Sequence, residues 1–256
     1  MPEIDRTGID RTGIDPGQVP NHVGLILDGN GRWANARGLP RTAGHAAGEA
    51  ALFDVVEGAI ELGIRWLSAY TFSTENWARS ADEVEFLMWF NEDLLVRRRD
   101  EFDAMGVRMR FAGDLDDPRI PDRNRTIMRQ AEDKTAGNRI LDLVFAFNYG
   151  SRAEIAAAAR AIAATVAAGE LDPDAVDAAV VARHLYVADI PDLDLVIRSS
   201  GEHRLSNFML WQSAYAELWF PGILWPDFDR HHLADAVRRY QQRHRRFGGA
   251  VDAVST

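Results

Sequence analysis

Short apolar runs alternate with helical patterns from His22 onward, and this alternation constrains the fold more than any other feature. Helices that connect successive strands return the chain to the same end of a sheet, so the pattern favours parallel pairing. We predict an α/β fold with a single domain, in which helices flank a central, mostly parallel six-stranded sheet. The expected strands are residues 23–27, 64–72, 107–111, 140–147, 193–197 and 216–220.

Two of the connecting helices carry start or stop signals. Ser80 and Glu83 have the spacing of a capping box, at the start of a helix that runs to about Met105. The first turns of this helix are apolar on nearly every face. We expect one face to pack on the sheet and another to line a lipid tunnel or a dimer interface, or the whole helix to be buried. Gly63 is placed to end the helix between the first two strands.

A chain of 256 residues can bury one large core, and no second domain is needed. We place the folded domain at residues 21–249, with a flexible N-terminal tail at 1–20 and a C-terminal tail at 250–256. The N-terminal tail contains the string Ile-Asp-Arg-Thr-Gly twice. Two copies are too few for a solenoid, so we interpret the repeat as sequence slippage.

Composition excludes several classes of function. The chain has no cysteine, which removes disulfides, thiolate nucleophiles and cysteine-ligated zinc. A formal net charge of −10 argues against a general nucleic-acid binder, and an anionic substrate would need arginines concentrated in a cleft. No run approaches the roughly 18 apolar residues of a spanning helix, and no signal peptide opens the chain, so we expect a cytoplasmic protein.

The string Asp28-Gly29-Asn30-Gly31-Arg32-Trp33 directly follows the first expected strand. It places a carboxylate at the carboxyl end of a strand, where open α/β sheets bind their ligands. The glycines allow close backbone approach, and amides at the next helix start can face a phosphate. Arg32, Arg41 and His45 add cationic groups, which a simple helix-cap role for Asp28 does not explain. One aspartate suffices for Mg²⁺, which completes its shell with water and substrate phosphate oxygens.

The same string also matches a dinucleotide fingerprint, through Gly29, Gly31 and Ala34 with Glu49 about 20 residues further on. An NAD-binding oxidoreductase is therefore an alternative. Two features oppose it: Glu49 falls inside a helical pattern, and Asp28 would repel a pyrophosphate unless a cation lies between them.

Polar loops follow two other expected strands. Residues 73–76 are Ser73, Thr74, Glu75 and Asn76, although a simple capped connection would also use such residues. In the loop 198–208, arginines and hydroxyl groups suit diphosphate oxygens. The alternative for Arg198 is a surface ion pair with Glu202, which would have little energetic value.

Together these strings closely resemble the cis-prenyltransferase family, and most closely its bacterial undecaprenyl diphosphate synthases, from about His22 to Gly249. The resemblance implies a magnesium-dependent enzyme that condenses isopentenyl diphosphate with an allylic diphosphate, such as farnesyl or geranyl diphosphate. The product would be a cis (Z) polyprenyl diphosphate. A homodimer, and loose membrane contact during release of the lipid product, are also implied. The matching segments are 22–33, 72–77, 148–150, 194–198, 201–204, 206–208, 210–212, 214–218 and 245–249.

The resemblance also implies roles for individual residues. Asp28 and Asn76 would be catalytic, and Asp28 and Glu217 would hold Mg²⁺. Because a neutral amide is a poor base, we expect Asn76 to orient the alkene or a water, while a diphosphate oxygen takes the proton. The allylic diphosphate would contact Gly29, Asn30, Gly31, Arg32, Arg41 and His45. Isopentenyl diphosphate would contact Arg198, Arg204, Leu205 and Ser206, with Ser73, Thr74, Glu75 and Arg79 nearby, while Trp33, Phe72 and Trp77 would meet hydrocarbon or shape the site.

Some questions stay open at this point. Thr71 and Phe147 stand where many relatives carry smaller residues and could narrow a product tunnel. We expect a medium or long product, undecaprenyl- or decaprenyl-like, with a short-chain Z-prenyl diphosphate synthase as the alternative. A non-catalytic partner subunit is opposed by Asp28 and Glu217. The trans-prenyltransferases need paired DDxxD motifs, which the chain lacks. We interpret the arginines of residues 238–246 as complements of a helix dipole rather than an RNA site, with Arg245 and Gly248 implied at a neighbouring subunit's site.

Overall fold

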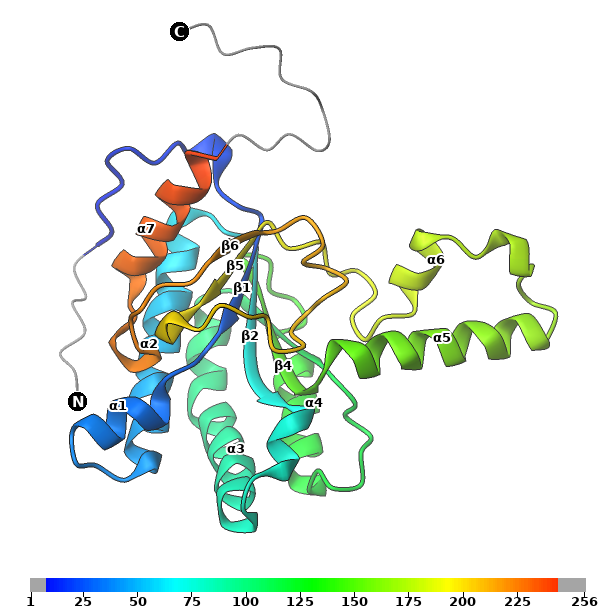
Figure 1. The fold of residues 1–256 in the computed structure, drawn as a ribbon, viewed down its shortest axis with the longest axis horizontal. Helices are drawn as coiled ribbons and strands as arrows, with labels where there is room; N and C mark the ends of the chain where they lie inside the picture. The colour runs from blue at the N-terminus through cyan, green and yellow to red at the C-terminus, as the bar shows by residue number, and fades with distance from the viewer. Residues whose placement is uncertain (1–7, 244–256) are drawn as a thin grey trace, which may run out of the picture.

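The computed structural model describes residues 8–243, and only the backbone of residues 90–92 (Figure 1). Six strands form one sheet in the order β3-β4-β2-β1-β5-β6, and every neighbouring pair is parallel. The predicted α/β fold and all six expected strands are therefore confirmed. The strands are β1 (His22–Ile26), β2 (Trp66–Ser73), β3 (Val107–Ala112), β4 (Leu141–Tyr149), β5 (Leu195–Arg198) and β6 (Glu217–Trp219).

The helices connect the strands and cover the sheet unequally (Figure 1). Most of the large core lies between one sheet face and α2, α3, α4 and α7, and a smaller cluster on the other face packs against the segments around β5. The α-helices are α1 (Asn30–Ala36), α2 (Arg41–Leu62), α3 (Ala81–Ala104), α4 (Asp122–Thr135), α5 (Ser151–Ala167), α6 (Ala178–Arg183) and α7 (Arg230–Gln241). The short 3-10 helices are η1 (Pro16–Gln18), η2 (Thr74–Ala78), η3 (Pro173–Ala175), η4 (Ser199–Gly201) and η5 (Trp225–Asp227).

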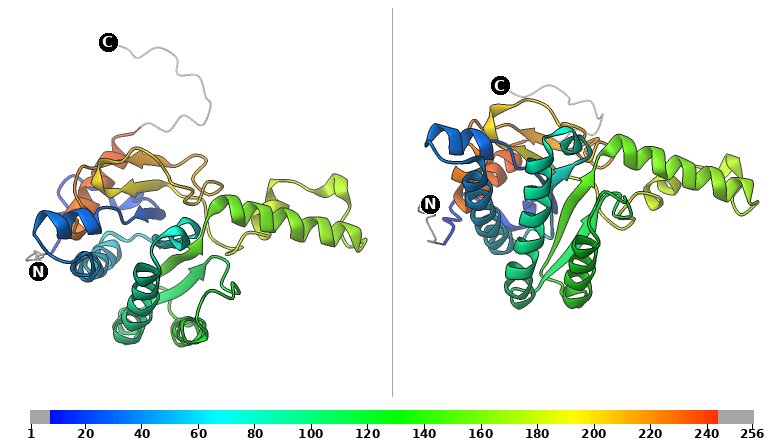
Figure 2. Two further views of the ribbon diagram at one scale, coloured as in Figure 1. Left: turned by 60° about the horizontal axis from the view of Figure 1, so that its bottom comes forward. Right: turned by 90° about the horizontal axis from the view of Figure 1, so that it is seen from below.

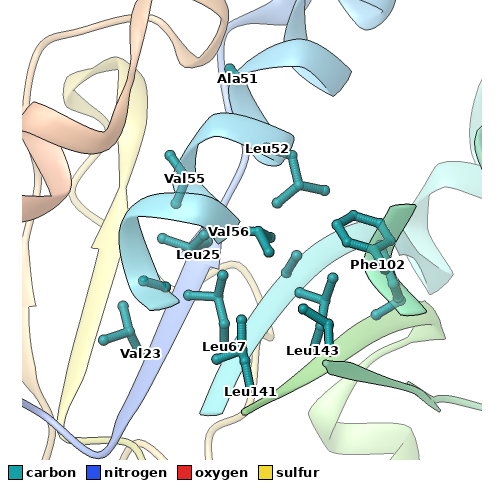
Figure 3. Packing of buried hydrophobic residues seen from close by; sticks show 14 of the residues in the cluster. Val23, Leu25, Ala51, Leu52, Val55, Val56, Leu67, Phe102, Leu141 and Leu143 are labelled. Carbon is teal, nitrogen blue, oxygen red and sulfur yellow. The ribbon is translucent and has the colours of Figure 1, made fainter. Parts of the chain in front are cut away.

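The alternation of side chains along β1 explains how the two faces are filled. Val23 and Leu25 point toward α2, where they meet Val55 and Val56 (Figure 3). Ile26 belongs to the cluster on the opposite face. A strand that is buried on both faces has apolar residues at nearly every position. The run of apolar residues therefore identifies such a strand in the sequence.

The expected start and stop signals are confirmed. Ser80 is the N-cap of α3, and its hydroxyl accepts the Glu83 N–H at 3.4 Å. Gly63 ends α2 with φ at 83°, in the left-handed region that glycine adopts without steric cost. The interpretation of α3 as fully buried is wrong, because Trp89 and Val96 are about half exposed. None of the helices in the described part of the chain combines the length and apolar character needed to cross a membrane.

The expected loose tail at residues 1–20 is corrected for residues 8–20. Ile9 is 9% exposed within the main core, and its N–H donates to Glu61 at 3.1 Å. Gln241 of α7 accepts the Asp15 N–H at 3.0 Å. Burial of one isoleucine, joined by these hydrogen bonds, holds the segment against α2 and α7. Residues 1–7 and the predicted C-terminal tail lie outside the described residues.

His22 at the start of β1 makes stability depend on pH. Its Nδ1 donates to the Pro191 carbonyl at 2.8 Å, so its Nε2 accepts the Ser68 hydroxyl at 2.8 Å. Burial lowers the pKa of His22 from 6.5 to about 4, against the opposing effects of Pro191 and Asp194. The unfolded chain therefore binds this proton more readily than the folded protein does.

We expect the free energy of unfolding to be highest above pH 6.5 and to fall as the pH drops from 6.5 toward about 4. The contribution of His22 is on the order of 3 kcal/mol. Urea denaturation at several pH values measures this slope. In a His22→Gln variant the free energy of unfolding should fall less between pH 6.5 and about 4. An equal pH dependence in the variant and the unsubstituted protein would contradict this role of His22.

Candidate active site

The polar loops identified in the sequence meet at one edge of the sheet. β2, β1 and β5 are neighbours and parallel, so the segments that follow their carboxyl ends open on the same side. A cavity of about 270 Å³ lies there. The predicted site residues that line it are Asp28, Gly29, Asn30, Gly31, Arg32, Arg41, His45, Asn76 and Arg79. The other lining residues are Leu27, Gly48, Glu49, Leu52, Tyr70, Thr71, Leu87, Leu94 and Trp225.

The backbone of Asp28 is fixed by two residues that the sequence analysis did not single out. The Ser199 hydroxyl accepts the Asp28 N–H at 2.9 Å and donates to the Asp28 carbonyl at 2.7 Å. The Trp225 N–H donates to the same carbonyl at 3.0 Å. Ser199 and Trp225 are both 1% exposed, so the position of Asp28 is held by buried neighbours rather than by its side chain.

The carboxylate of Asp28 lies between two guanidinium groups. Arg198 donates to Oδ2 at 2.8 Å, and Arg32 lies 3.3 Å from Oδ1. Burial alone would raise the pKa of Asp28, but hydrogen bonds from Arg198 and Ser200 and the charges of Arg198 and Arg32 hold it below its usual value. Asp28 is therefore ionised at neutral pH, at the mouth of the cavity.

Arg198 is the central cation of the site and is 4% exposed. Besides Asp28, it donates to the Arg204 carbonyl at 2.7 Å and to the Ser206 hydroxyl at 2.6 Å. Its Nε–H is buried and lacks a hydrogen-bond partner among the described residues. A buried guanidinium N–H without a partner is costly, which favours an anionic ligand at this point.

The suggested surface pair between Arg198 and Glu202 is wrong. Glu202 lies 2.5 Å from Arg204 and 3.8 Å from Arg32 instead. Arg204 is exposed and its guanidinium points to this carboxylate, so an arriving diphosphate would compete with Glu202 for it. Ser200 has φ at 79°, an unusual conformation for a serine, and its hydroxyl accepts Arg32 at 2.6 Å.

The loop after β2 contributes Asn76 and Arg79 to the cavity wall. The Ser73 N–H donates to Asn76 Oδ1 at 2.9 Å, which leaves the amide NH₂ of Asn76 as its available group. Glu75 accepts Thr74 Oγ1 at 3.1 Å and Asn207 Nδ2 at 3.0 Å. Ser73, Thr74 and Glu75 thus shape this loop, and none of the three lines the cavity.

Glu83 joins the start of α2 to the start of α3 through an ion pair with Arg41, a role that the sequence analysis missed. Glu83, recognised only as a capping residue, binds Arg79 at 2.8 Å and Arg41 at 3.3 Å. Gly31 leaves room for the side chain of Arg41. A Cβ added at Gly31 would lie only 3.0 Å from the guanidinium carbon of Arg41. Burial, and then the charge of Arg79, lower the pKa of His45 to about 4, so the imidazole is neutral at neutral pH.

The three aromatic residues expected to meet hydrocarbon or to shape the site do not line the cavity. Trp33 is 3% exposed in a small cluster under α1, and its indole N–H donates to Asp227 at 2.6 Å. Phe72 is fully buried in the main core. Trp77 donates to Asn148 at 2.7 Å and lines a neighbouring groove. These residues support the walls of the cavity rather than line it. Leu205 packs against the cluster on the other face of the sheet.

The structure does not bring Glu217 to Asp28. Glu217 begins β6 and is in register with Leu195, which is in register with Val23. Ile26, the last residue of β1, lies about 10 Å beyond Val23 along the strand direction, and Asp28 follows it. The Glu217 carboxylate lies 3.7 Å from Arg243 Nε instead. Within one chain Glu217 and Asp28 therefore lie apart, and the role of the two residues as a pair of metal ligands stays a prediction.

The fold and the site define an α/β protein with a cationic, anion-binding mouth next to a partly apolar cavity. Residues 26–248 match the sequence profile of the family described as "Putative undecaprenyl diphosphate synthase". The chain belongs to this family of cis-prenyltransferases and is an enzyme that transfers prenyl groups. The dinucleotide alternative is therefore wrong, and Glu49 lies within α2 and is bound by Arg97 and Arg98.

Two curated relatives and one crystal structure illustrate the similarity. The trans,polycis-polyprenyl diphosphate synthase ((2Z,6E)-farnesyl diphosphate specific) of Thermobifida fusca is 59% identical, covering 91% of this chain and 82% of the relative. The decaprenyl diphosphate synthase of Mycobacterium leprae is 52% identical, covering 93% and 79%. Lavandulyl diphosphate synthase from Lavandula x intermedia, solved with dimethylallyl diphosphate, has a TM-score of 0.87 and 37% identity, covering 91% of this chain and 99% of that one.

Proposed function

We propose that the enzyme condenses isopentenyl diphosphate with an allylic diphosphate to form a cis (Z) polyprenyl diphosphate and release diphosphate. One observation carries this proposal: an ionised Asp28, flanked by Arg198 and Arg32, lies at the mouth of a cavity whose deeper wall carries leucines. Such a site can bind an anionic head group at its mouth and a hydrocarbon tail inside.

Two groups of residues suit two diphosphates. Arg32, Arg41 and the neutral His45 face the cavity from α1 and α2 and would bind the allylic diphosphate. Arg198, Arg204 and Ser206 gather on the β5 side and would bind isopentenyl diphosphate. Asp28 lies between the two groups and contacts one arginine of each. This arrangement supports a reaction between two diphosphate esters held side by side.

The chemical step breaks the allylic C–O bond, and the electron pair leaves with the diphosphate. The alkene of isopentenyl diphosphate then bonds to the allylic carbon, and one proton is lost. Preorganised arginine charges stabilise the departing anion, because they act where negative charge develops. The Asn76 amide oxygen is already bonded to Ser73, so Asn76 would orient a substrate while a diphosphate oxygen accepts the proton.

Asp28 would hold Mg²⁺, together with substrate phosphate oxygens and water. An ionised carboxylate is the hard oxygen donor that Mg²⁺ prefers, and one or two carboxylates suffice when phosphates complete the shell. In the described part of the chain no group of three acidic or histidine side chains is arranged to hold a metal ion, so substrate phosphates and water would have to complete the shell. The ion would supply charge that stabilises the leaving diphosphate.

Incubation with labelled isopentenyl diphosphate, Mg²⁺ and allylic primers of three lengths tests the proposed function. We expect incorporation with at least one primer, and its loss when EDTA removes the metal. Assaying the purified chain alone also distinguishes an active enzyme from a non-catalytic partner subunit. No incorporation with any primer would contradict the proposal.

We propose a medium or long product. Curated relatives named as decaprenyl diphosphate synthases support it, since several are 51–52% identical to this chain. The relative whose name gives it as specific for (2Z,6E)-farnesyl diphosphate supports an allylic primer about the size of farnesyl diphosphate. A short-chain Z-prenyl diphosphate synthase stays the alternative. Thr71 lines the cavity and could narrow it, whereas Phe147 is buried in the core and does not line it. Sizing the labelled products decides between them.

We also propose a cytoplasmic homodimer that contacts membranes loosely when it releases product. β6 is a sheet edge, and Leu218 within it and Tyr215 just before it are 43% and 73% exposed, which suits a protein contact. Arg245 and Gly248, implied at a neighbouring subunit's site, lie outside the described residues. Sedimentation of the purified protein measures the oligomeric state.

A further inference from the structure

The cavity extends from its charged mouth into a space between two helices. Leu52 of α2 and Leu87 and Leu94 of α3 line its apolar part. Both views in Figure 2 place α2 and α3 side by side on the same face of the sheet. Behind this space the sheet is filled by Leu67 and Phe72, which are fully buried. The sheet side of the cavity is therefore closed.

The cavity is too small for the proposed product. A cavity of about 150 Å³ holds a benzene-sized guest, so about 270 Å³ holds roughly two such guests. A decaprenyl chain has ten isoprene units and would not fit. Each condensation adds a unit next to the diphosphate, which pushes the older hydrocarbon away from the mouth. With the sheet closed, the growing chain must pass between α2 and α3.

A network of charges fastens α2 to α3 at this place. Glu49 lines the cavity and is 7% exposed. Arg97 binds its carboxylate through two hydrogen bonds of 2.9 and 2.8 Å, and Arg98 adds a third at 2.9 Å. Asp93 holds Arg97 at 2.8 Å, and Glu101 holds Arg98 at 2.8 Å.

The Arg98 guanidinium also lies 4.6 Å from the ring centre of Phe53 on α2. Two arginines thus converge on one buried carboxylate and close the gap between the helices. A paired arrangement of this kind resists opening, because separating the helices would leave the buried charge of Glu49 uncompensated.

We propose that the ion-pair network of Glu49, Arg97 and Arg98 determines product length, by limiting how far α2 and α3 separate as the hydrocarbon grows. This inference rests on the proposed function. While the product is short, the network stays closed and condensation proceeds freely. Each later unit works against the network, so chain growth slows until release is faster than further addition.

Weakening the network is expected to lengthen the product. In an Arg97→Gln/Arg98→Gln double variant, the ratio of late to first condensation rates should rise at least about tenfold, because three charge-assisted hydrogen bonds are lost and the loss of one alone has about that effect. Arg99→Gln is the matched control, since Arg99 lies on the same helix and pairs with its exposed neighbour Asp100 at 3.3 Å. The control should keep the original product distribution.

The double variant leaves Glu49 buried without its two arginines, so Glu49→Gln serves as a second variant that removes the charge itself. Its products should also shift to longer chains. A distribution in both variants that is unchanged or shorter would overturn the proposal. Failure of the proposed function is recognised separately, because the unsubstituted protein would then incorporate no isopentenyl diphosphate.

Cross-linking tests the same idea in the opposite direction. The natural chain has no cysteine, so a Glu49→Cys/Arg97→Cys variant carries its only two thiols across the gap. Joining them with a short bis-maleimide should confine the products to short chains, relative to the same variant before cross-linking. Equal product lengths before and after cross-linking would contradict the role of helix separation.

Discussion

Replacing Asp28 with alanine is expected to lower turnover by about 10²–10³-fold or more, the usual effect of losing one preorganised electrostatic contact in an active site. The substitution removes the ionised group between Arg198 and Arg32 and with it the proposed magnesium ligand. The fold should survive, because the buried residues Ser199 and Trp225 hold the backbone of Asp28, although the thermal stability should fall since buried Arg198 loses its carboxylate partner. Steady-state incorporation of labelled isopentenyl diphosphate measures the loss.

Two further variants make this prediction specific. Asp28→Asn keeps the size of the side chain and loses its charge, so it should be nearly as inactive as alanine. Asp189→Asn removes a carboxylate that binds Arg110 and does not line the cavity, and it should retain activity. Circular dichroism and thermal unfolding confirm that each protein is folded. A folded Asp28→Ala protein with ordinary turnover would remove Asp28 from the catalytic site.

Replacing Arg230 with methionine is expected to cost about 3–5 kcal/mol of stability, the usual effect of breaking a buried ion pair from one side. Arg230 is 5% exposed at the start of α7, and its backbone N–H and its Nε each donate to Asp54 at 2.7 Å. It also binds Glu61 at 2.8 Å and Glu57. Without the guanidinium, Asp54 would stay buried in α2 with an uncompensated charge.

Urea denaturation measures this loss, which is a large part of the roughly 5–15 kcal/mol that stabilises a typical domain. A second substitution, Asp54→Leu, should restore much of the stability of the Arg230→Met variant, because it removes the stranded charge. Lys134→Ala is the control, since Lys134 forms an exposed pair with Asp100 at 2.9 Å and should contribute at most about 1 kcal/mol. A loss of similar size in both single variants would contradict the argument from burial.

The predicted sheet and the loops at its edge came from local signals in the sequence. Six apolar runs marked six strands. β1, β4 and β5 are buried at every position and so read as nearly continuous apolar runs, whereas the edge strand β3 alternates apolar and charged residues. Gly63 marked the end of α2 for a reason confined to its own backbone conformation. Asp28 was recognised because a carboxylate followed by Gly29 and Gly31 comes directly after a strand, and the structure places it in the wall of the cavity.

Contacts between distant segments could not be predicted from the sequence. A pair between Arg198 and Glu202 was only an alternative based on their closeness in sequence, and Arg198 binds Asp28, which is 170 residues away. The resemblance implied that Glu217 joins Asp28 at a metal ion; the register of β6 separates the two residues within one chain, and this role stays a prediction. Trp33 was expected to meet hydrocarbon or to shape the site, and the structure places its ring in a small buried cluster with Ala34 and Ala47. Ion pairs and ring contacts between distant segments leave no periodic trace in a sequence.

The sequence by itself determined the order of the strands and helices, the polar loops between them and the family, because periodicity, turn chemistry and motif spacing are properties of neighbouring residues. Only the tertiary structure decided which charges meet. The strand order β2-β1-β5 brings Asp28 to Arg198, and the packing of α2 beside α3 brings Glu49 to Arg97 and Arg98. Coulomb energies depend on distance and burial, and both quantities exist only once the chain has folded.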